Sequence, residues 1–299
     1  MWEAGEQRVR VVVIQNRGAG GRHAPDEVAA ALRAAGVEAE VRLVEGPTCR
    51  AAAVAAAARG ADAVVAAGGD GTVSAVAAAL AGSGTPMGVL PLGTLNHFAR
   101  DLGIPLELAD AARVVAAGVV RRVDVAEVNG HRFVNNSSVG FYPRVVQRRT
   151  RLRSFLGKWL AMAWGTLAVL WRLPRMRLRL ETETGGAPVV TPFLFVGNNR
   201  YEPGLFPERR REALDRGELR VYVARSAGRR AFLRIALRWL LGRGRHEDVA
   251  ELSARTVRVV ARRRGLDVSA DGEVLRLRPP LRYLIHPRAL AVLAPRPAP

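Results

Sequence analysis

The sequence predicts two domains. The first is an α/β domain built on a doubly wound parallel sheet. The second is an antiparallel, sandwich-like β domain with inserted helices. Up to about residue 121, short apolar runs alternate with helical patterns, which is typical of a parallel sheet covered by helices. Beyond that point strand-like runs follow one another with few helices between them. We therefore expect domains at 1–121 and 122–284.

Four strand–helix steps are expected in the first domain. Pro25 followed by two acids opens the first helix, because proline fits the first turn and carboxylates favour its positive end. The apolar runs predict strands at 9–14, 37–43, 63–67 and 87–90. Helices are predicted from Pro25, with Val28 and Leu32 on one face, and at 48–59, 73–80 and 106–118. In the second domain Asn129-Gly130 predicts a tight hairpin. Strands are expected there at 176–182, 189–196, 219–223, 256–260, 266–270 and 274–277.

The stretch Gly68-Gly69-Asp70-Gly71-Thr72 lies between a buried strand and a helix. Glycines allow a tight turn and the close approach of an anion to the main chain. The start of a helix carries unpaired N–H groups and partial positive charge, both suited to a phosphate. Asp70 suits a hydrated magnesium ion, and the Thr72 hydroxyl is a potential donor to a phosphate oxygen. The alternative is a glycine-rich turn without a ligand.

A second loop of this kind begins at Pro91 and reads Pro-Leu-Gly-Thr-Leu-Asn. It again places a Gly-Thr pair, Gly93-Thr94, between an apolar strand and a helix. Parallel strands bring such loops to the same edge of a sheet, where open α/β sheets bind ligands. The two loops together therefore predict a phosphate site more strongly than either alone.

These two loops, followed late in the chain by Asp271-Gly272-Glu273, resemble the bacterial diacylglycerol kinase family. This family comprises lipid kinases related to sphingosine kinases and, more distantly, to NAD kinases. The similarity runs over nearly the whole chain in the expected order, and it implies ATP and Mg²⁺ as cofactors. It also implies that the tail 285–299 returns to the first domain. The nucleotide-binding positions that it implies are Asn16, Arg17, Gly18, Ala19, Gly20, Gly68, Gly69, Asp70, Gly71, Thr72, Gly93, Thr94 and Asn96.

The acids of the late turn are the candidates for proton transfer. A carboxylate near a lipid hydroxyl helps phosphoryl transfer by accepting its proton. We expect Glu273 to be the acceptor, with Asp271 as alternative base or electrostatic partner, while Asp70 positions magnesium and phosphate through water. On spacing alone a hairpin turn at Asp-Gly is favoured, and it is the resemblance that favours the acid pair in catalysis. In an extended backbone the side chains of residues 271 and 273 would point the same way.

Several positions depart from the family pattern. In the first loop Arg17 stands where proline is usual, and Ala19 stands where serine is usual. Arg216 occupies the place of an aspartate that helps to bind a structural magnesium in relatives, and a cation there would repel a metal. Asp215, one residue earlier, is the alternative metal ligand. Two further departures are Val44, in place of a threonine, and His97, in place of an aspartate.

Charge and composition bear on partners. The chain has 299 residues, a formal net charge of +19 and a single cysteine, Cys49. The charge implies an anionic partner, or a basic proteome with solvated arginines. Nucleic acid is not expected, because no binding motif with interleaved aromatic residues is present. No signal-peptide pattern is seen, so a cytoplasmic location is expected.

Two basic, apolar helical segments are predicted, at 148–173 and 229–245. Arginines beside Trp and Leu suit a helix lying on an anionic membrane, and equally an amphipathic helix packed on a sheet. The uncharged part of the first is too short to span a bilayer. The loop 198–204 resembles the family's loop near the lipid cleft, with a polar surface turn as the alternative.

The leading hypothesis is an ATP-dependent lipid kinase that associates peripherally with the membrane. The acceptor is left open among diacylglycerol, a sphingoid base, phosphatidylglycerol and other hydroxylated lipids. Two alternatives remain. One is an NAD kinase-like enzyme, against which the Pro91 loop and the late acids argue. The other is a non-catalytic nucleotide- or lipid-binding relative. A homodimer is also left open.

Overall fold

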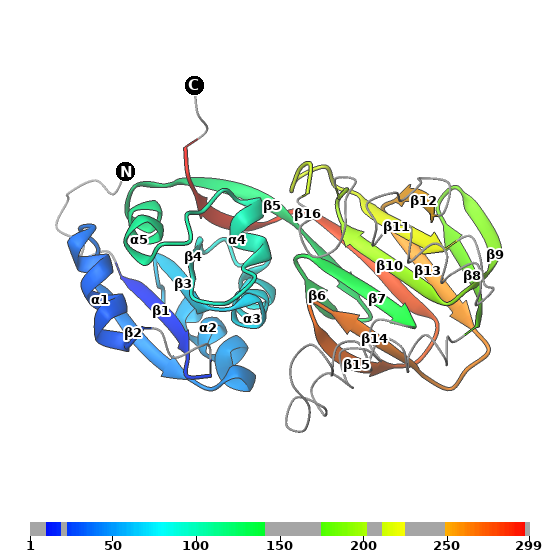
Figure 1. Cartoon of the computed structure of the whole chain (residues 1–299), viewed down its shortest axis with the longest axis horizontal. Helices are drawn as coiled ribbons and strands as arrows, with labels where there is room; N and C mark the ends of the chain where they lie inside the picture. The colour runs from blue at the N-terminus through cyan, green and yellow to red at the C-terminus, as the bar shows by residue number, and fades with distance from the viewer. Residues whose placement is uncertain (1–9, 19–22, 141–174, 202–210, 225–248, 297–299) are drawn as a thin grey trace, which may run out of the picture. The chain divides into compact units, whose positions relative to one another are not determined.

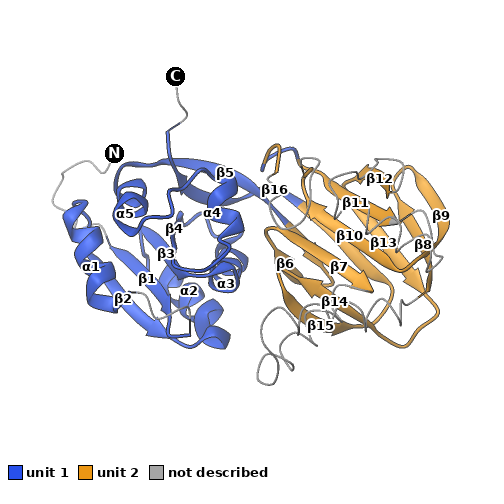
Figure 2. Cartoon of the chain, viewed as in Figure 1, with its two compact units in different colours: residues 1–125, 214–216, 286–299 blue, residues 126–213, 217–285 orange. Residues whose placement is uncertain are grey.

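The computed structural model describes residues 10–18, 23–140, 175–201, 211–224 and 249–296. They form two compact units, which Figure 2 shows in separate colours. Unit 1 comprises residues 1–125, 214–216 and 286–299, and unit 2 comprises residues 126–213 and 217–285. Both predicted basic helices, and Ala19 and Gly20 of the first loop, lie outside the described residues.

Unit 1 contains a parallel sheet in the order β2-β1-β3-β4 (Figure 1). These strands are β1 (Val11–Asn16), β2 (Ala39–Val44), β3 (Ala63–Gly68) and β4 (Met87–Pro91). Every residue of β3 and β4 is buried, which explains their unbroken apolar sequence. The four predicted strands are therefore confirmed, with ends shifted by no more than two residues.

The helices of unit 1 form two packed pairs. One pair is α1 (Pro25–Ala34) with α5 (Leu108–Ala117), and the other is α2 (Cys49–Ala58) with α3 (Asp70–Leu80). α1 buries Val28 and Leu32, one turn apart on the same face. A 3-10 turn η1 (Gly46–Thr48) precedes α2, and a short helix α4 (His97–Asp101) follows β4. The strand–helix order places three loops after β1, β3 and β4.

The end of the chain adds to unit 1. The last part of β16 (Leu281–Ala294) pairs in parallel with β4, with Val292 beside Met87. The N–H of Gly82 donates to the carbonyl of Ala289 at 2.7 Å. β16 and β5 (Val119–Val128) each contribute residues to both units.

Unit 2 is antiparallel. One sheet has the order β12-β11-β10-β7-β14-β15. Its strands are β12 (Val249–Ala254), β11 (Leu219–Ala224), β10 (Phe193–Asn198), β7 (Asn136–Gly140), β14 (Leu266–Ala270) and β15 (Glu273–Leu277).

The other strands of unit 2 belong to the mixed sheet that also includes the parallel strands. β8 (Met176–Thr182) pairs with β9 (Gly185–Thr191) and with β13 (Thr256–Ala261), and β13 pairs with the start of β16. A short strand β6 (His131–Phe133) pairs with β5. Buried side chains of both sheets, such as Leu178, Tyr283, Val196 and Val268, form one hydrophobic cluster.

Most strand predictions for unit 2 are confirmed, with two differences. The run 189–196 is not one strand, because the chain leaves β9 at Pro192 and enters the other sheet as β10. Proline cannot donate a ladder hydrogen bond, which fits a break there. β7 and β12 were not predicted. The Asn129-Gly130 hairpin is confirmed, with φ of 46° and 86° at its two residues.

Candidate functional site

The glycine loops after β3 and β4 meet backbone to backbone. A Cβ atom placed on Gly93 would lie 2.5 Å from the Cα atom of Gly69 and 2.8 Å from Oδ1 of Asn96. No real Cβ atom tolerates such contacts, so residue 93 must be glycine for the loops to approach this closely. The two motifs that the sequence singled out therefore form one structure.

Asp70 ties the first of these loops to the second. Its Oδ1 accepts a hydrogen bond from the N–H of His97 at 2.7 Å, and its Oδ2 accepts one from the N–H of Asn96 at 3.0 Å. Asn96 has a left-handed backbone, with φ of 52°, and precedes α4. A carboxylate is favourable at this position, since the N–H groups at the start of a helix lack backbone partners.

The side chain of Asn96 shapes the second loop from within. Its Oδ1 accepts from the N–H of Gly93 at 3.0 Å, while its Nδ2 donates to the carbonyls of Pro91 and Gly93 at 3.2 and 3.0 Å. The residue is 6% exposed. Both amide donors are thus used inside the loop, which favours a structural task over direct contact with a nucleotide.

Asn16 and Thr72 join the loop after β1 to the other two. The Nδ2 atom of Asn16 donates to Oγ1 of Thr72 at 3.1 Å, and its Oδ1 accepts from the N–H of Gly18 at 3.0 Å. Thr72 is 3% exposed and lies under Gly68, where a Cβ atom would be 2.5 Å from its Oγ1. The hydroxyl therefore links two loops, and its predicted donation to a phosphate stays a prediction.

Several groups at this edge remain at the surface. Arg17, Gly18, Gly71 and Thr94 are exposed, and Gly69 and Gly93 are half-buried. Asp70 is the single acid within residues 16–18, 68–72 and 91–97. Its carboxylate accepts hydrogen bonds from two backbone N–H groups. Small residues, an arginine and the start of α3 provide what a nucleotide's phosphates require. The residues present thus fit ATP.

In unit 2 the late acidic motif forms a hairpin turn. Asp271 and Gly272 have φ of 45° and 87°, and Ala270 pairs with Glu273 across the turn. This is the type I′ geometry that Asp-Gly favours. The backbone is not extended here, so the spacing argument that would point both acids the same way does not apply.

The two acids of the turn have different surroundings. The Asp271 carboxylate accepts three backbone hydrogen bonds, from Val134 at 2.8 Å, Asn135 at 2.8 Å and Asn136 at 3.0 Å. Glu273, by contrast, is exposed. The geometry favours a structural task for Asp271 and leaves Glu273 as the better candidate for proton transfer.

Arg211 holds the same segment from another side, and it was not predicted. It is 6% exposed. Its Nη1 donates to the carbonyl of Val134 and, at 3.4 Å, to that of Asn198, and its Nη2 donates to Oδ1 of Asn135 at 3.1 Å. In the sequence it is one of three consecutive arginines at 209–211, so nothing marked it as buried.

Further polar side chains are buried beside this segment. Asn198 and Asn199 are fully buried, so the alternative of a polar surface turn is wrong for these two residues. Nδ2 of Asn198 donates to the carbonyl of Val134 at 2.9 Å, and the Tyr201 hydroxyl donates to the carbonyl of Asn135 at 3.0 Å. Residues 202–204 of the predicted lipid-cleft loop lie outside the described residues.

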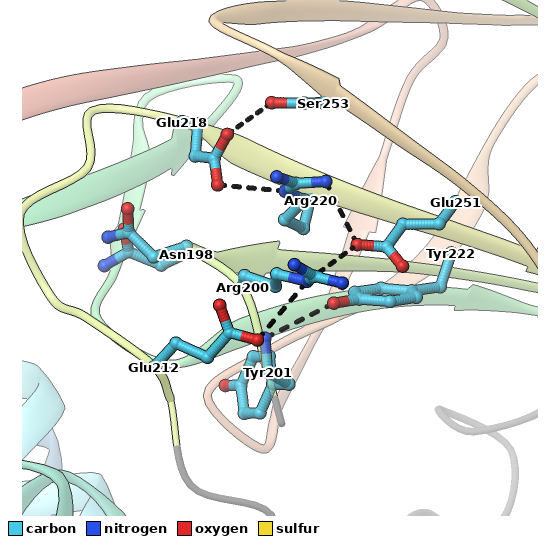
Figure 3. A network of polar contacts seen from close by, with 10 residues as sticks. Asn198, Arg200, Tyr201, Glu212, Glu218, Arg220, Tyr222, Glu251 and Ser253 are labelled. Carbon is cyan, nitrogen blue, oxygen red and sulfur yellow. Dashed lines mark hydrogen bonds and ion pairs between the residues drawn. The ribbon is translucent and has the colours of Figure 1, made fainter. Parts of the chain in front are cut away.

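An ion-pair network extends from this loop over β11 and β12 (Figure 3). Arg200 lies 3.4 Å from Glu212 and 3.5 Å from Glu251, and Arg220 binds Glu251 at 3.1 Å and Glu218 at 2.9 Å. The hydroxyl of Ser253 donates to Glu218 at 2.5 Å. The pair of Arg220 with Glu251 joins β11, the strand that follows Gly217, to β12.

Asp215 faces a cation. Its Oδ1 lies 3.8 Å from the guanidinium of Arg121. Within the described ranges, no group of three or more His, Cys, Asp or Glu side chains lies close enough together to hold a metal ion. Arg121 beside Asp215 disfavours a cation there, and the role of Asp215 as a metal ligand stays a prediction.

Comparison with known proteins identifies the family. The model of the diacylglycerol kinase catalytic domain matches residues 10–128. A Pseudomonas aeruginosa protein named "Probable lipid kinase YegS-like" is 34% identical over 227 residues, which cover 71% of this chain and 69% of that protein. The chain belongs to the diacylglycerol kinase catalytic-domain family. This membership supports a kinase-type phosphotransferase that acts on a lipid.

Other diacylglycerol kinase family matches agree. A protein of the same name from Yersinia pestis is 38% identical over 73 residues, which are 24% of this chain and 25% of that protein. A crystal structure of a diacylglycerol kinase from Bacillus anthracis has a TM-score of 0.69 at 20% identity, covering 96% of this chain and 97% of that one. A further Bacillus anthracis structure has a TM-score of 0.76 at 22% identity and the same coverage. These structures support the two-domain fold.

None of the helices in the described part of the chain is long and apolar enough to cross a membrane.

Proposed function

We propose that this protein is an ATP-dependent lipid kinase, which transfers the γ-phosphate of ATP to a hydroxyl of diacylglycerol or a similar lipid. The observation that carries the proposal is the joined pair of glycine loops, in which Gly69 and Gly93 touch and Asp70 bridges to Asn96. Family membership supplies the lipid-kinase class. The loops supply a place for phosphates at the carboxyl edge of a parallel sheet.

The nucleotide's phosphates are proposed to lie against the backbone of Gly69, Gly71 and Gly93, near the start of α3. Arg17 and Thr94 are exposed at this edge and are proposed to contact phosphate oxygens. Asp70, Asn96 and Thr72 keep the loops in place. Mg²⁺ is proposed to come with the phosphates, since this ion is commonly held by substrate phosphates, waters and one or two carboxylates.

Glu273 is proposed to accept the proton of the lipid hydroxyl, because its exposed carboxylate is available to a substrate. Asp271 is proposed to position the segment 134–136 and not to act as a base, since three N–H groups occupy its carboxylate. The charge of +19 supports the further proposal that the enzyme works at an anionic membrane surface on the cytoplasmic side.

The test is a transfer assay with γ-labelled ATP, magnesium and a total lipid extract, followed by separation of the lipids. The wild-type protein is expected to label a lipid, and Glu273→Gln is expected to lose at least 100-fold in rate, in the range typical of removing a general base. Glu38→Gln is the matched control, because Glu38 is exposed just before β2, at the amino edge of the sheet.

Failure would have two distinct forms. A protein that binds ATP and labels no lipid would indicate a non-catalytic nucleotide-binding relative. Labelled NADP⁺ formed from NAD⁺, with no labelled lipid, would indicate an NAD kinase-like enzyme. Equal rates for wild type and Glu273→Gln would retain the kinase and remove Glu273 from its proposed role.

A further inference from the structure

Residues 134–136 carry the turn that leads to Glu273. The carboxylate of Asp271 accepts hydrogen bonds from the N–H groups of all three residues, at 2.8 to 3.0 Å. The N–H of Asp271 donates in return to the carbonyl of Asn136 at 2.9 Å. Hydrogen bonds in both directions therefore join the turn to this segment.

The sheet supports Glu273 from one side. Glu273 is the first residue of β15, which forms an edge of the six-stranded sheet and pairs there with β14. The pairing of β14 with β7 runs from Val268 to Ala270 and stops before the turn. Beyond Ala270, the place of Glu273 therefore depends on the turn and on the segment that Asp271 binds.

Arg211 holds the same segment through its oxygen atoms. The Nη1 atom of Arg211 donates to the carbonyl of Val134, and its Nη2 atom donates to Oδ1 of Asn135 at 3.1 Å. Asp271 binds the N–H groups of these two residues. The two side chains thus bind complementary groups of one segment, Arg211 its acceptors and Asp271 its donors.

The backbone of Arg211 is itself held in place. Arg211 forms an antiparallel β-bridge with Tyr201, and the N–H of Glu212 donates to the carbonyl of Arg200 at 3.0 Å. The side chain of Arg211 is buried. A planar fork of donors on a fixed backbone holds two acceptors in a set geometry, which a single ammonium group does not.

We propose that Arg211 is a positioning residue for the proton acceptor. It fixes the segment 134–136, this segment fixes the turn at Asp271, and the turn sets the place of the Glu273 carboxylate. The proposal rests on the proposed function, in which Glu273 takes the proton of the lipid hydroxyl. A base must lie within hydrogen-bond reach of the proton that it accepts, and a displacement of about 1 Å can cost on the order of 100-fold in rate.

The experiment is a double-mutant cycle of Arg211→Met and Glu273→Gln, measured as transfer from γ-labelled ATP to a total lipid extract. In the wild-type background, Arg211→Met is expected to lower the apparent kcat about 10- to 100-fold, because Glu273 is displaced. The KM for ATP is expected to stay within about twofold, because the proposed contacts of the nucleotide lie in the glycine loops of unit 1.

The second half of the cycle separates positioning from a loss of structure. In the Glu273→Gln background, Arg211→Met is expected to change the rate by less than about twofold, since a residue that acts through Glu273 has no carboxylate left to position. A general defect of unit 2 would instead lower the rate by the same factor in both backgrounds.

Two further variants complete the experiment. Arg262→Met is the control for the loss of an exposed arginine, and its rate is expected to stay within about twofold of the wild type. Arg211→Lys takes the place of Arg211→Met in the cycle if the latter does not fold, because lysine retains the charge without the planar fork. Circular dichroism at the assay temperature shows which variants are folded.

Two results would overturn this proposal alone. One is an Arg211→Met protein as active as the wild type while Glu273→Gln is inactive. The other is an equal fold-loss from Arg211→Met in both backgrounds. Failure of the proposed function looks different, because a wild type that labels no lipid, or a fully active Glu273→Gln protein, removes the proton acceptor that Arg211 would position.

Discussion

The carboxylate of Asp70 and the backbone N–H of Asn96 are 3.0 Å apart, although they belong to different loops. With the second bond to His97, at 2.7 Å, this contact makes the first residue of α3 the cap of α4. An acid that sequence patterns assign to magnesium thus also holds together the two loops that are proposed to bind phosphate. The two tasks are compatible, because each carboxylate oxygen has two lone pairs.

Replacing Asp70 is therefore expected to reduce stability as well as activity. Asp70→Ala leaves two N–H groups without their acceptor, which costs about 1–3 kcal/mol for a half-buried site. Urea unfolding followed by circular dichroism measures this loss, and Glu38→Gln is the control. Unchanged unfolding together with lost phosphate transfer would indicate that Asp70 acts only on the metal and substrate.

The contact between Gly69 and Gly93 gives a matched pair of glycine variants. Gly93→Ala is expected to destabilise by about 1–3 kcal/mol, as overpacked sites do, because its Cβ atom would overlap Gly69. Gly71→Ala places its Cβ atom in open space within α3 and is expected to be neutral or stabilising by up to about 1 kcal/mol. Thermal unfolding of both variants measures the difference. If the two variants lost the same stability, the close approach of Gly69 and Gly93 would impose no particular cost on a side chain at position 93.

Asp271 and Glu273 are expected to separate stability from catalysis. Asp271→Asn retains the shape of the side chain but loses one acceptor and all of the charge, so a stability loss of about 1–3 kcal/mol is expected. Glu273→Gln alters an exposed side chain and is expected to change stability by less than about 0.5 kcal/mol. Unfolding and transfer rates are measured on the same preparations. A stable Asp271→Asn protein without activity would return Asp271 to the role of a base.

Cys49 reports on the integrity of unit 1. Burial raises the pKa of its thiol, so little reactive thiolate is present near neutral pH. The side chain is fully buried, and it is the single cysteine of the chain. A chromogenic disulfide reagent is expected to react with one thiol per chain in urea and at least 100-fold more slowly in buffer, since reaction there requires an opening of the structure. Fast reaction in buffer would show that α2 opens readily.

Much of unit 1 could be predicted from the sequence, because the signals for its strands and turns lie in neighbouring residues. Buried parallel strands such as β3 read as unbroken apolar runs, and Gly93 and Gly69 mark a backbone approach that other residues cannot make. The Asn129-Gly130 turn was equally readable, since few residues adopt two consecutive positive φ values.

Other features could not be read, because they depend on contacts between distant residues. The cap from Asp70 to His97 spans 27 positions, and Asp271 binds Val134 across 137. At Pro192 the chain passes from β9 in one sheet to β10 in the other. The residues on both sides of this proline, 189–196, are mostly apolar and therefore looked like one strand.

Arg211 gives the strongest contrast between sequence and structure. Its sequence neighbours make it one of a run of arginines, yet it is buried and donates to Val134, Asn198 and Asn135. Arg211→Met removes the donor to Oδ1 of Asn135 and one of the two side-chain donors to the carbonyl of Val134, and a loss of about 2–4 kcal/mol is expected because these acceptors are buried.

Arg211→Lys distinguishes charge from geometry at the same position. Lysine retains the charge but cannot present a planar fork to three acceptors, so only part of the stability is expected to return. Arg262→Met is the control, because Arg262 is exposed and its loss is expected to change stability by less than about 0.5 kcal/mol. Urea unfolding of the three variants decides the matter. A destabilisation of Arg211→Met no larger than that of Arg262→Met would mean that Asp271, Asn198 and Tyr201 hold residues 134–136 without Arg211.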